Sequence, residues 1–215
     1  MIYDLCEGVC HYVMLYVMQH CIPQYFNIDL LNYRIAIFKY GPCDSNHVPP
    51  VSVQKLKMSG SEILMFVKLF GLLISDKVPT YDPFWCLYLK LCQLLDLCLA
   101  KSLTVHPSGS FRVIVEEFNS MYVNITKDNL KPKFHNLIHY ATVFEQSGPV
   151  SLTSTKRFES EHRTLLVPAH ANESRTNTAL TLSIQHQLNQ CYCFKAKIPL
   201  IPKIVFGRPS EVFFV

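Results

Sequence analysis

The sequence predicts a mainly α-helical protein with a few short strands. Of its 215 residues, 49% are apolar and 17% are charged, so enough apolar side chains are present to fill a substantial core. Several long apolar segments begin at Ser or at Asp-Pro and end at Gly or Pro, which are typical helix boundaries. The tail, residues 198–215, instead places β-branched and aromatic residues between Pro and Gly, and there we expect two short strands.

Two helices and a loop are expected in the first 53 residues. A helix should run from Asp4 to about His20 and end at Pro23. Its apolar residues recur near one stripe, at Leu5, Val9, Val13, Tyr16 and Val17. A second helix should cover residues 28–38, closed by Gly-Pro, and the three prolines within 41–53 mark a loop.

Three helices are expected in the middle of the chain. The first begins at Ser59 or Ser61, either of which would cap the apolar stretch that follows. Asp82 and the proline after it form an N-cap and first-turn pair for a helix over 83–100. Large apolar side chains surround that helix almost completely, so it should be the buried centre of the core. The third helix should cover 111–124.

Three further helices are expected over 132–146, 155–166 and 178–192. Each of them follows a Pro, Ser, Thr or Gly that is typical of a helix start. No internal repeat or low-complexity tract interrupts this order.

Cysteine usage and hydropathy bear on the surroundings of the protein. The nine cysteines include no C-x-x-C pair, so we expect buried free thiols and a nuclear or cytoplasmic, reducing location. The stretch between Glu7 and Asp29 lacks charged side chains, but its His, Gln, Asn and Pro residues make it too polar for a membrane span. We therefore expect no membrane association.

The charge of the chain is unevenly placed. Residues 1–125 carry nine Lys and Arg against ten Asp and Glu, a net charge of −1, whereas residues 126–215 carry eleven against six, a net charge of +5. Within KRFESEHR, residues 156–163, carboxylates stand among cations. Such a mixture suits chemistry on a phosphate backbone, because carboxylates hold Mg²⁺ and cations neutralise phosphates. A solvated helix face has the same composition.

The sequence gives less support to a zinc site, a nucleophilic serine or a phosphate-binding loop. His135 and His139 are four residues apart on one helical face, a spacing that can chelate zinc. The hydrolytic version of this motif needs Glu after the first His, and Asn136 stands there. We favour a structural pair that is hydrogen-bonded inside the fold, or a helix edge lining a DNA channel. The sequence contains neither a G-x-S-x-G elbow nor a G-K-[ST] phosphate loop.

Several spaced segments together resemble a known family. IYDLCEGVCHYV at 2–13, YGPCD at 40–44, KPKFHNLIHY at 131–140, SGPV at 147–150 and KRFESEHR at 156–163 occur in this order. In this respect the chain is similar to the C-terminal part of the CACTA (En/Spm-like) superfamily of DDE transposases. The resemblance spans residues 2 to about 187. It implies an incomplete ribonuclease-H-like core at 1–53 and 129–215, with a helical insertion at 54–128.

The resemblance also implies roles for particular residues. In the family, two Asp and one Glu bind a pair of metal ions that activate water and then a DNA 3′-hydroxyl. The family's Glu lies in R-F-E-x-x-H-R, which this chain matches from Arg157 to Arg163. Glu159 is thus the vestigial catalytic and metal-binding carboxylate, and Glu161 is its rival by composition only. The ancestral cofactor would be Mg²⁺.

The same resemblance predicts that the chain is not an enzyme. The family's second Asp would fall immediately before Met1, and the first would lie further upstream. One carboxylate leaves most of the coordination sphere of Mg²⁺ to water and cannot hold two ions. We therefore expect no catalysis and no cofactor.

Two kinds of partner are expected. The first is DNA, bound without sequence preference by the residues Lys131, Lys133, Lys156, Arg157, His162, Arg163 and Arg175. The alternative is a protein-interaction module, in which a second copy or another protein covers an exposed core face. If the resemblance holds, Asp4 and Glu159 should lie close together in the fold, because the insertion leaves the core and returns to it.

Overall fold

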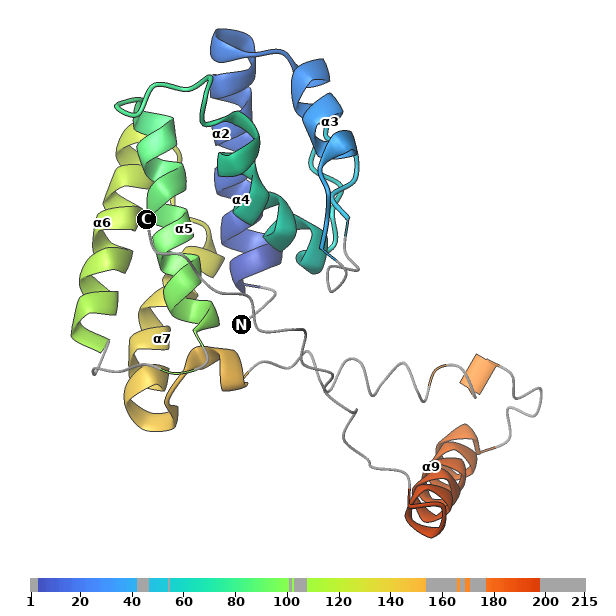
Figure 1. Cartoon of the computed structure of the whole chain (residues 1–215). Helices are drawn as coiled ribbons and strands as arrows, with labels where there is room; N and C mark the ends of the chain where they lie inside the picture. The colour runs from blue at the N-terminus through green and yellow to red at the C-terminus, as the bar shows by residue number, and fades with distance from the viewer. Residues whose placement is uncertain are drawn as a thin grey trace, which may run out of the picture. The chain divides into compact units, whose positions relative to one another are not determined.

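Figure 1 shows the computed structural model, which describes residues 4–41, 47–53, 55–100, 102, 108–153, 166, 169–170 and 177–197. Regular structure within these ranges is entirely helical, which confirms the mainly α fold class. The expected strands in 198–215 lie outside the described residues, as does the expected helix over 155–166 except for Leu166. Residues 1–155 form one compact unit and residues 156–215 another. Among the described helices, none combines the length and apolar character needed to cross a membrane.

A continuous helical rod begins the first unit. The π-helix η1 (Leu5–Cys10) passes directly into α2 (His11–Tyr25), and the expected apolar stripe along them is buried except at Tyr16, which is partly buried. The expected stop at Pro23 is wrong, because the helix continues through this residue to Tyr25. Pro23 removes one backbone hydrogen bond in the last turn. That turn is held from outside, since the Tyr25 hydroxyl donates to Asp82 at 2.8 Å and Ile22 is buried.

Two helices with well-formed N-caps follow. In α3 (Ile28–Ile37) the Asn27 side chain accepts from the Leu30 amide at 2.9 Å. In α4 (Gly60–Ile74) Ser59 and Glu62 form a capping box, so Ser59 rather than Ser61 is the cap. The two helices pack together, and Arg34 of α3 pairs with Asp76 just beyond α4.

Three longer helices complete the bundle. They are α5 (Pro83–Leu99), α6 (Ser108–Thr126) and α7 (Pro132–Ser147), and the short 3₁₀ helix η2 (Val150–Thr153) follows. The predicted start at Asp82 is confirmed, because its carboxylate accepts from the Trp85 amide at 2.9 Å. Helix α5 packs between α2 and α6, and α7 packs on α6 and η1 (Figure 1).

The centre of the core differs in part from the prediction. Helix α5 is largely buried, but Leu89 is 48% exposed, and Gln93 and Asp96 extend this exposed stripe. The rod of η1 and α2 is enclosed more fully, because α4 and α7 pack on η1 and α5 packs on α2. A run of leucines predicts apolar faces but does not specify which of them meets solvent.

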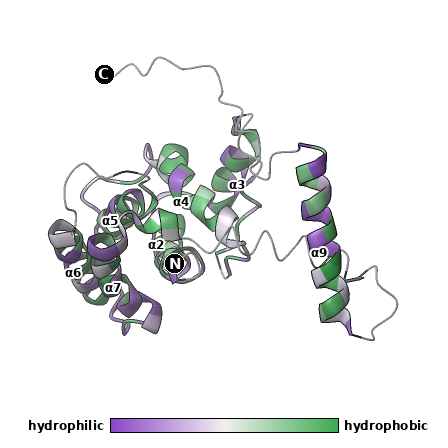
Figure 2. Cartoon of the chain, turned by 90° about the horizontal axis from the view of Figure 1, so that it is seen from below, coloured by the Kyte–Doolittle hydropathy of each residue, from purple (hydrophilic) through white to green (hydrophobic). Residues whose placement is uncertain are grey.

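The second unit contains α9 (Thr178–Lys195), which confirms the helix expected over 178–192. The helix has no buried residue, and hydrophobic and hydrophilic residues alternate along it (Figure 2). Asn177 caps it, accepting from the Leu180 amide at 3.4 Å.

The predicted division at 53 and 128 stays a prediction. Helices from all three segments, including α2, α5 and α7, share one buried cluster. A helical insertion can share a core with its host, so this packing is compatible with the division.

Candidate nucleic-acid interface

Two of the segments that carry the family resemblance meet in the fold. The start of η1 comes from DLCEG, and α7 comes from KPKFHNLIHY. The Asp4 carboxylate accepts a hydrogen bond from the side-chain amide of Asn136 at 2.9 Å, across 132 positions of sequence. The Tyr140 hydroxyl donates to the other carboxylate oxygen of Asp4 at 3.4 Å. This end of the bundle is therefore organised around Asp4.

Close packing of η1 on α7 depends on a glycine. The methylene stem of Lys133 lies over Gly8, and a Cβ atom at Gly8 would stand 2.2 Å from Cδ of Lys133. The Lys133 ammonium donates to the Glu7 carbonyl at 3.4 Å. A predicted phosphate contact is thus positioned by its packing on the first helix.

Lys131, a second predicted phosphate contact, is engaged within the chain. Its ammonium lies 3.0 Å from Asp128, which also accepts a bond from the Tyr16 hydroxyl at 3.0 Å. These two donors hold the pKa of Asp128 below its ordinary value, and Asp128 raises the pKa of Lys131. A phosphate at this position would compete with a carboxylate that is already bound.

The histidine pair is hydrogen-bonded, and it lies on the surface. His135 and His139 are exposed on α7, with their Nε2 atoms 3.2 Å apart. One nitrogen must donate and the other accept, so at least one ring lacks a proton at Nε2. Within the described ranges, no group of three or more His, Cys, Asp or Glu side chains is arranged to hold a metal ion.

Most of the predicted site lies outside the described residues. This applies to Glu159 with its rival Glu161, and to the remaining candidate DNA contacts Lys156, Arg157, His162, Arg163 and Arg175. The expected proximity of Asp4 and Glu159 therefore stays a prediction.

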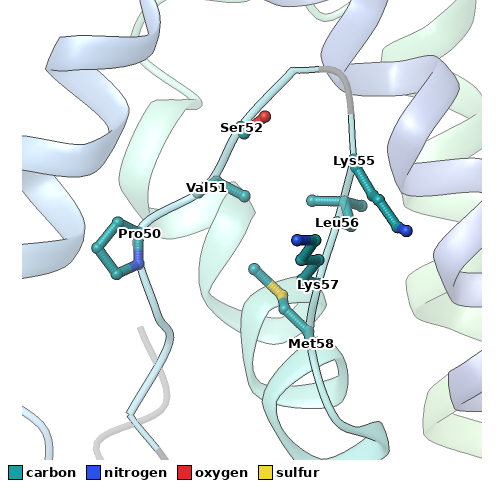
Figure 3. A pocket seen from close by; sticks show the side chains of 7 residues that line it. All are labelled: Pro50, Val51, Ser52, Lys55, Leu56, Lys57 and Met58. Atoms are coloured by element: carbon teal, nitrogen blue, oxygen red, sulfur yellow. The ribbon is translucent and has the colours of Figure 1, made fainter.

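The loop before α4 carries a basic site that was not predicted from the sequence. A hollow of about 440 Å³ is lined by Pro50, Val51, Ser52, Lys55, Leu56, Lys57 and Met58 (Figure 3). We call it the lysine pocket. Burial and the nearby charges of Lys133 and Lys55 lower the pKa of His11, so this loop and α7 act on the same part of the rod. The available signal was two lysines in a run without acidic residues, from 45 to 61.

The interface can offer cations and hydrogen-bond donors to an anion. Lys55, Lys57 and Lys133 supply ammonium groups, and the described carboxylates Asp4 and Asp128 already have donors within the chain. Such an arrangement suits electrostatic contact with phosphates. The chain matches no protein-family model, no curated protein and no solved structure.

Proposed function

We propose that this chain is a remnant of a CACTA-like DDE transposase that has no catalytic activity and binds DNA weakly, without sequence preference. The observation that supports the proposal best is the contact of η1 with α7. Asn136 and Asp4 belong to two different segments of the resemblance and are bonded at 2.9 Å. In a two-metal nuclease site the carboxylates must converge on shared ions, so segments of the resemblance that flank them should pack together.

Absence of catalysis follows from the carboxylates. Among the 215 residues, Glu159 alone matches a catalytic position of the family. Two divalent ions need several carboxylate oxygens, and one side chain supplies two at most. The chain by itself should therefore neither cleave nor join DNA with Mg²⁺ or Mn²⁺. Metal-dependent strand transfer that Glu159→Gln abolishes would overturn this part of the proposal.

DNA binding is expected to be electrostatic and to centre on the basic C-terminal part. Fluorescence anisotropy of a labelled duplex, titrated at several salt concentrations, gives the slope of log affinity against log salt. Each phosphate contact contributes about 0.9 to this slope. Replacing Lys156, Arg157 and Arg163 by Ala should lower it by roughly 2.7 if all three contact phosphates. Binding unchanged in this triple variant would refute the assignment.

A protein-interaction module is the second candidate function, and α9 favours it. Four large apolar side chains spaced four residues apart are exposed on this helix, at Leu180, Ile184, Leu188 and Tyr192. An exposed apolar stripe is a common protein-binding surface. If this alternative holds, the chain should self-associate or retain a protein partner in size-exclusion chromatography with light scattering, and replacing Ile184 and Leu188 by Gln should abolish the association.

A further inference from the structure

We propose that the lysine pocket is a binding site for the DNA phosphate backbone, in which Lys55 and Lys57 supply the positive charge. The inference rests on the proposed DNA-binding function and adds contacts that the basic C-terminal part does not contain. Its ligand is a phosphodiester, which would accept charge-assisted hydrogen bonds from the ammonium groups.

The two loop lysines are available to a ligand. Lys55 and Lys57 are both exposed, and neither forms a hydrogen bond or an ion pair with another residue in the part of the chain that is described. In Figure 3 the Lys57 side chain extends toward Val51 across the hollow, whereas the Lys55 side chain lies on the other side of the backbone segment that carries both. None of the described residues that line the pocket is acidic.

Several other described cations differ in this respect. Arg34 pairs with Asp76, Lys90 with Glu117 and Lys131 with Asp128. A phosphate that binds such a cation must displace or share a carboxylate, which reduces the net gain. Lys55 and Lys57 need no such exchange.

The pocket is formed before any ligand arrives. The backbone amide of Val51 donates to the side-chain oxygen of Asn32 at 2.7 Å. The side-chain NH₂ group of Asn32 donates back to the Val51 carbonyl at 3.1 Å. Val51 and Leu56 are buried in the core, and the capping box at Ser59 fixes the chain where the pocket ends. A preformed site avoids the entropy cost of ordering a loop on binding.

The test compares two variants with equal loss of charge. Lys55→Gln/Lys57→Gln removes the pocket lysines, and Lys77→Gln/Lys90→Gln removes two lysines that pair with Asp76 and Glu117. Anisotropy against a labelled 20-base-pair duplex should show a salt slope about 1.8 smaller for the first variant. The second variant should keep the wild-type slope to within about half a unit. Lys55→Arg/Lys57→Arg should retain binding, because Arg keeps the charge.

The outcomes separate this inference from the proposed function. A Lys55→Gln/Lys57→Gln protein with the wild-type slope would overturn the inference, whereas loss of binding in the Lys156, Arg157 and Arg163 variant would still support the proposed function. Equal losses in the pocket variant and in its charge-matched control would also overturn the inference, since only net charge would then matter. A wild-type chain without affinity for the duplex would refute both.

Discussion

Asp82 should be the most sensitive polar residue of the bundle. Its side chain is 4% exposed and joins the end of α2 to the start of α5. One oxygen caps α5 by accepting from the Trp85 amide at 2.9 Å. The other accepts from the Tyr25 hydroxyl at 2.8 Å and lies 2.9 Å from Nε2 of His20. Replacement by Ala removes all of these acceptors at once.

The expected cost can be built up from the individual bonds. Loss of the cap costs about 1 kcal/mol, and loss of the Tyr25 bond to a charged acceptor costs about 1.5 kcal/mol. The His20 bond contributes less, on the order of 0.5 kcal/mol, because His20 is partly exposed and water can replace the carboxylate. Asp82→Ala should therefore lower the free energy of unfolding by roughly 2 to 4 kcal/mol.

The assay is urea denaturation followed by far-UV circular dichroism, with Asp96→Ala as the control. Asp96 lies on the exposed stripe of the same helix, so its replacement should change the free energy of unfolding by no more than about 0.5 kcal/mol. Asp82→Asn should have an intermediate effect, since one amide oxygen can replace only one of the two carboxylate oxygens. If Asp82→Ala and Asp96→Ala have equal effects, the linking role of Asp82 is wrong.

The same carboxylate gives a pH dependence. Burial raises the pKa of Asp82. Hydrogen bonds from the Trp85 amide, His20 and Tyr25 lower it by a larger amount, so the pKa lies below the ordinary value of 3.8. A lowered pKa in the folded state contributes stability that is complete above the unfolded value and is lost as pH falls through the folded value. The stability difference between wild type and Asp82→Ala should therefore shrink below about pH 4.

Two further predictions concern packing, and both can be measured by the same denaturation assay. Gly8→Ala should be less stable than wild type by about 1 to 3 kcal/mol, because its Cβ would overlap the Lys133 stem. In a Lys133→Ala background the same change should cost less, because the overlap with Cδ is removed and only a 3.0 Å contact with the retained Cβ atom is left. Equal effects in both backgrounds would contradict the close contact. Leu91→Ala should cost about 2 to 5 kcal/mol, since Leu91 is fully buried. Leu89→Ala, on the exposed stripe of the same helix, should cost less than about 1 kcal/mol, and a reversed order would refute the described orientation of α5.

Helix starts could be predicted from the sequence because their signals are local. Ser59 with Glu62, and Asp82 with the following proline, each place a cap within one turn of its helix. The end at Pro23 could not be predicted, because the turn around it is held by Tyr25 bonding to Asp82, 57 positions away. Leu89 illustrates the same limit, since nothing in a run of leucines says which one faces solvent.

The candidate interface shows a similar contrast. Lys131 and Lys133 could be selected for their charge, and the partner of Lys131 lies three residues away at Asp128, within reach of a local argument. The convergence of Lys55 and Lys133 on His11 depends on how α7 and the loop before α4 pack on the first helix. Such long-range proximity is a property of the tertiary fold and has no local signal in the sequence.

The distance between Asp4 and Glu159 tests the proposed transposase origin most directly. An experimental structure of the full chain would measure it between the two carboxylates. If the family resemblance holds, Asp4 stands only a few residues from a metal-ligand position. Metal ligands must converge on ions roughly 4 Å apart, so a separation on the order of 10–15 Å is predicted. Glu159 on the opposite side of the bundle from Asp4 would contradict the account.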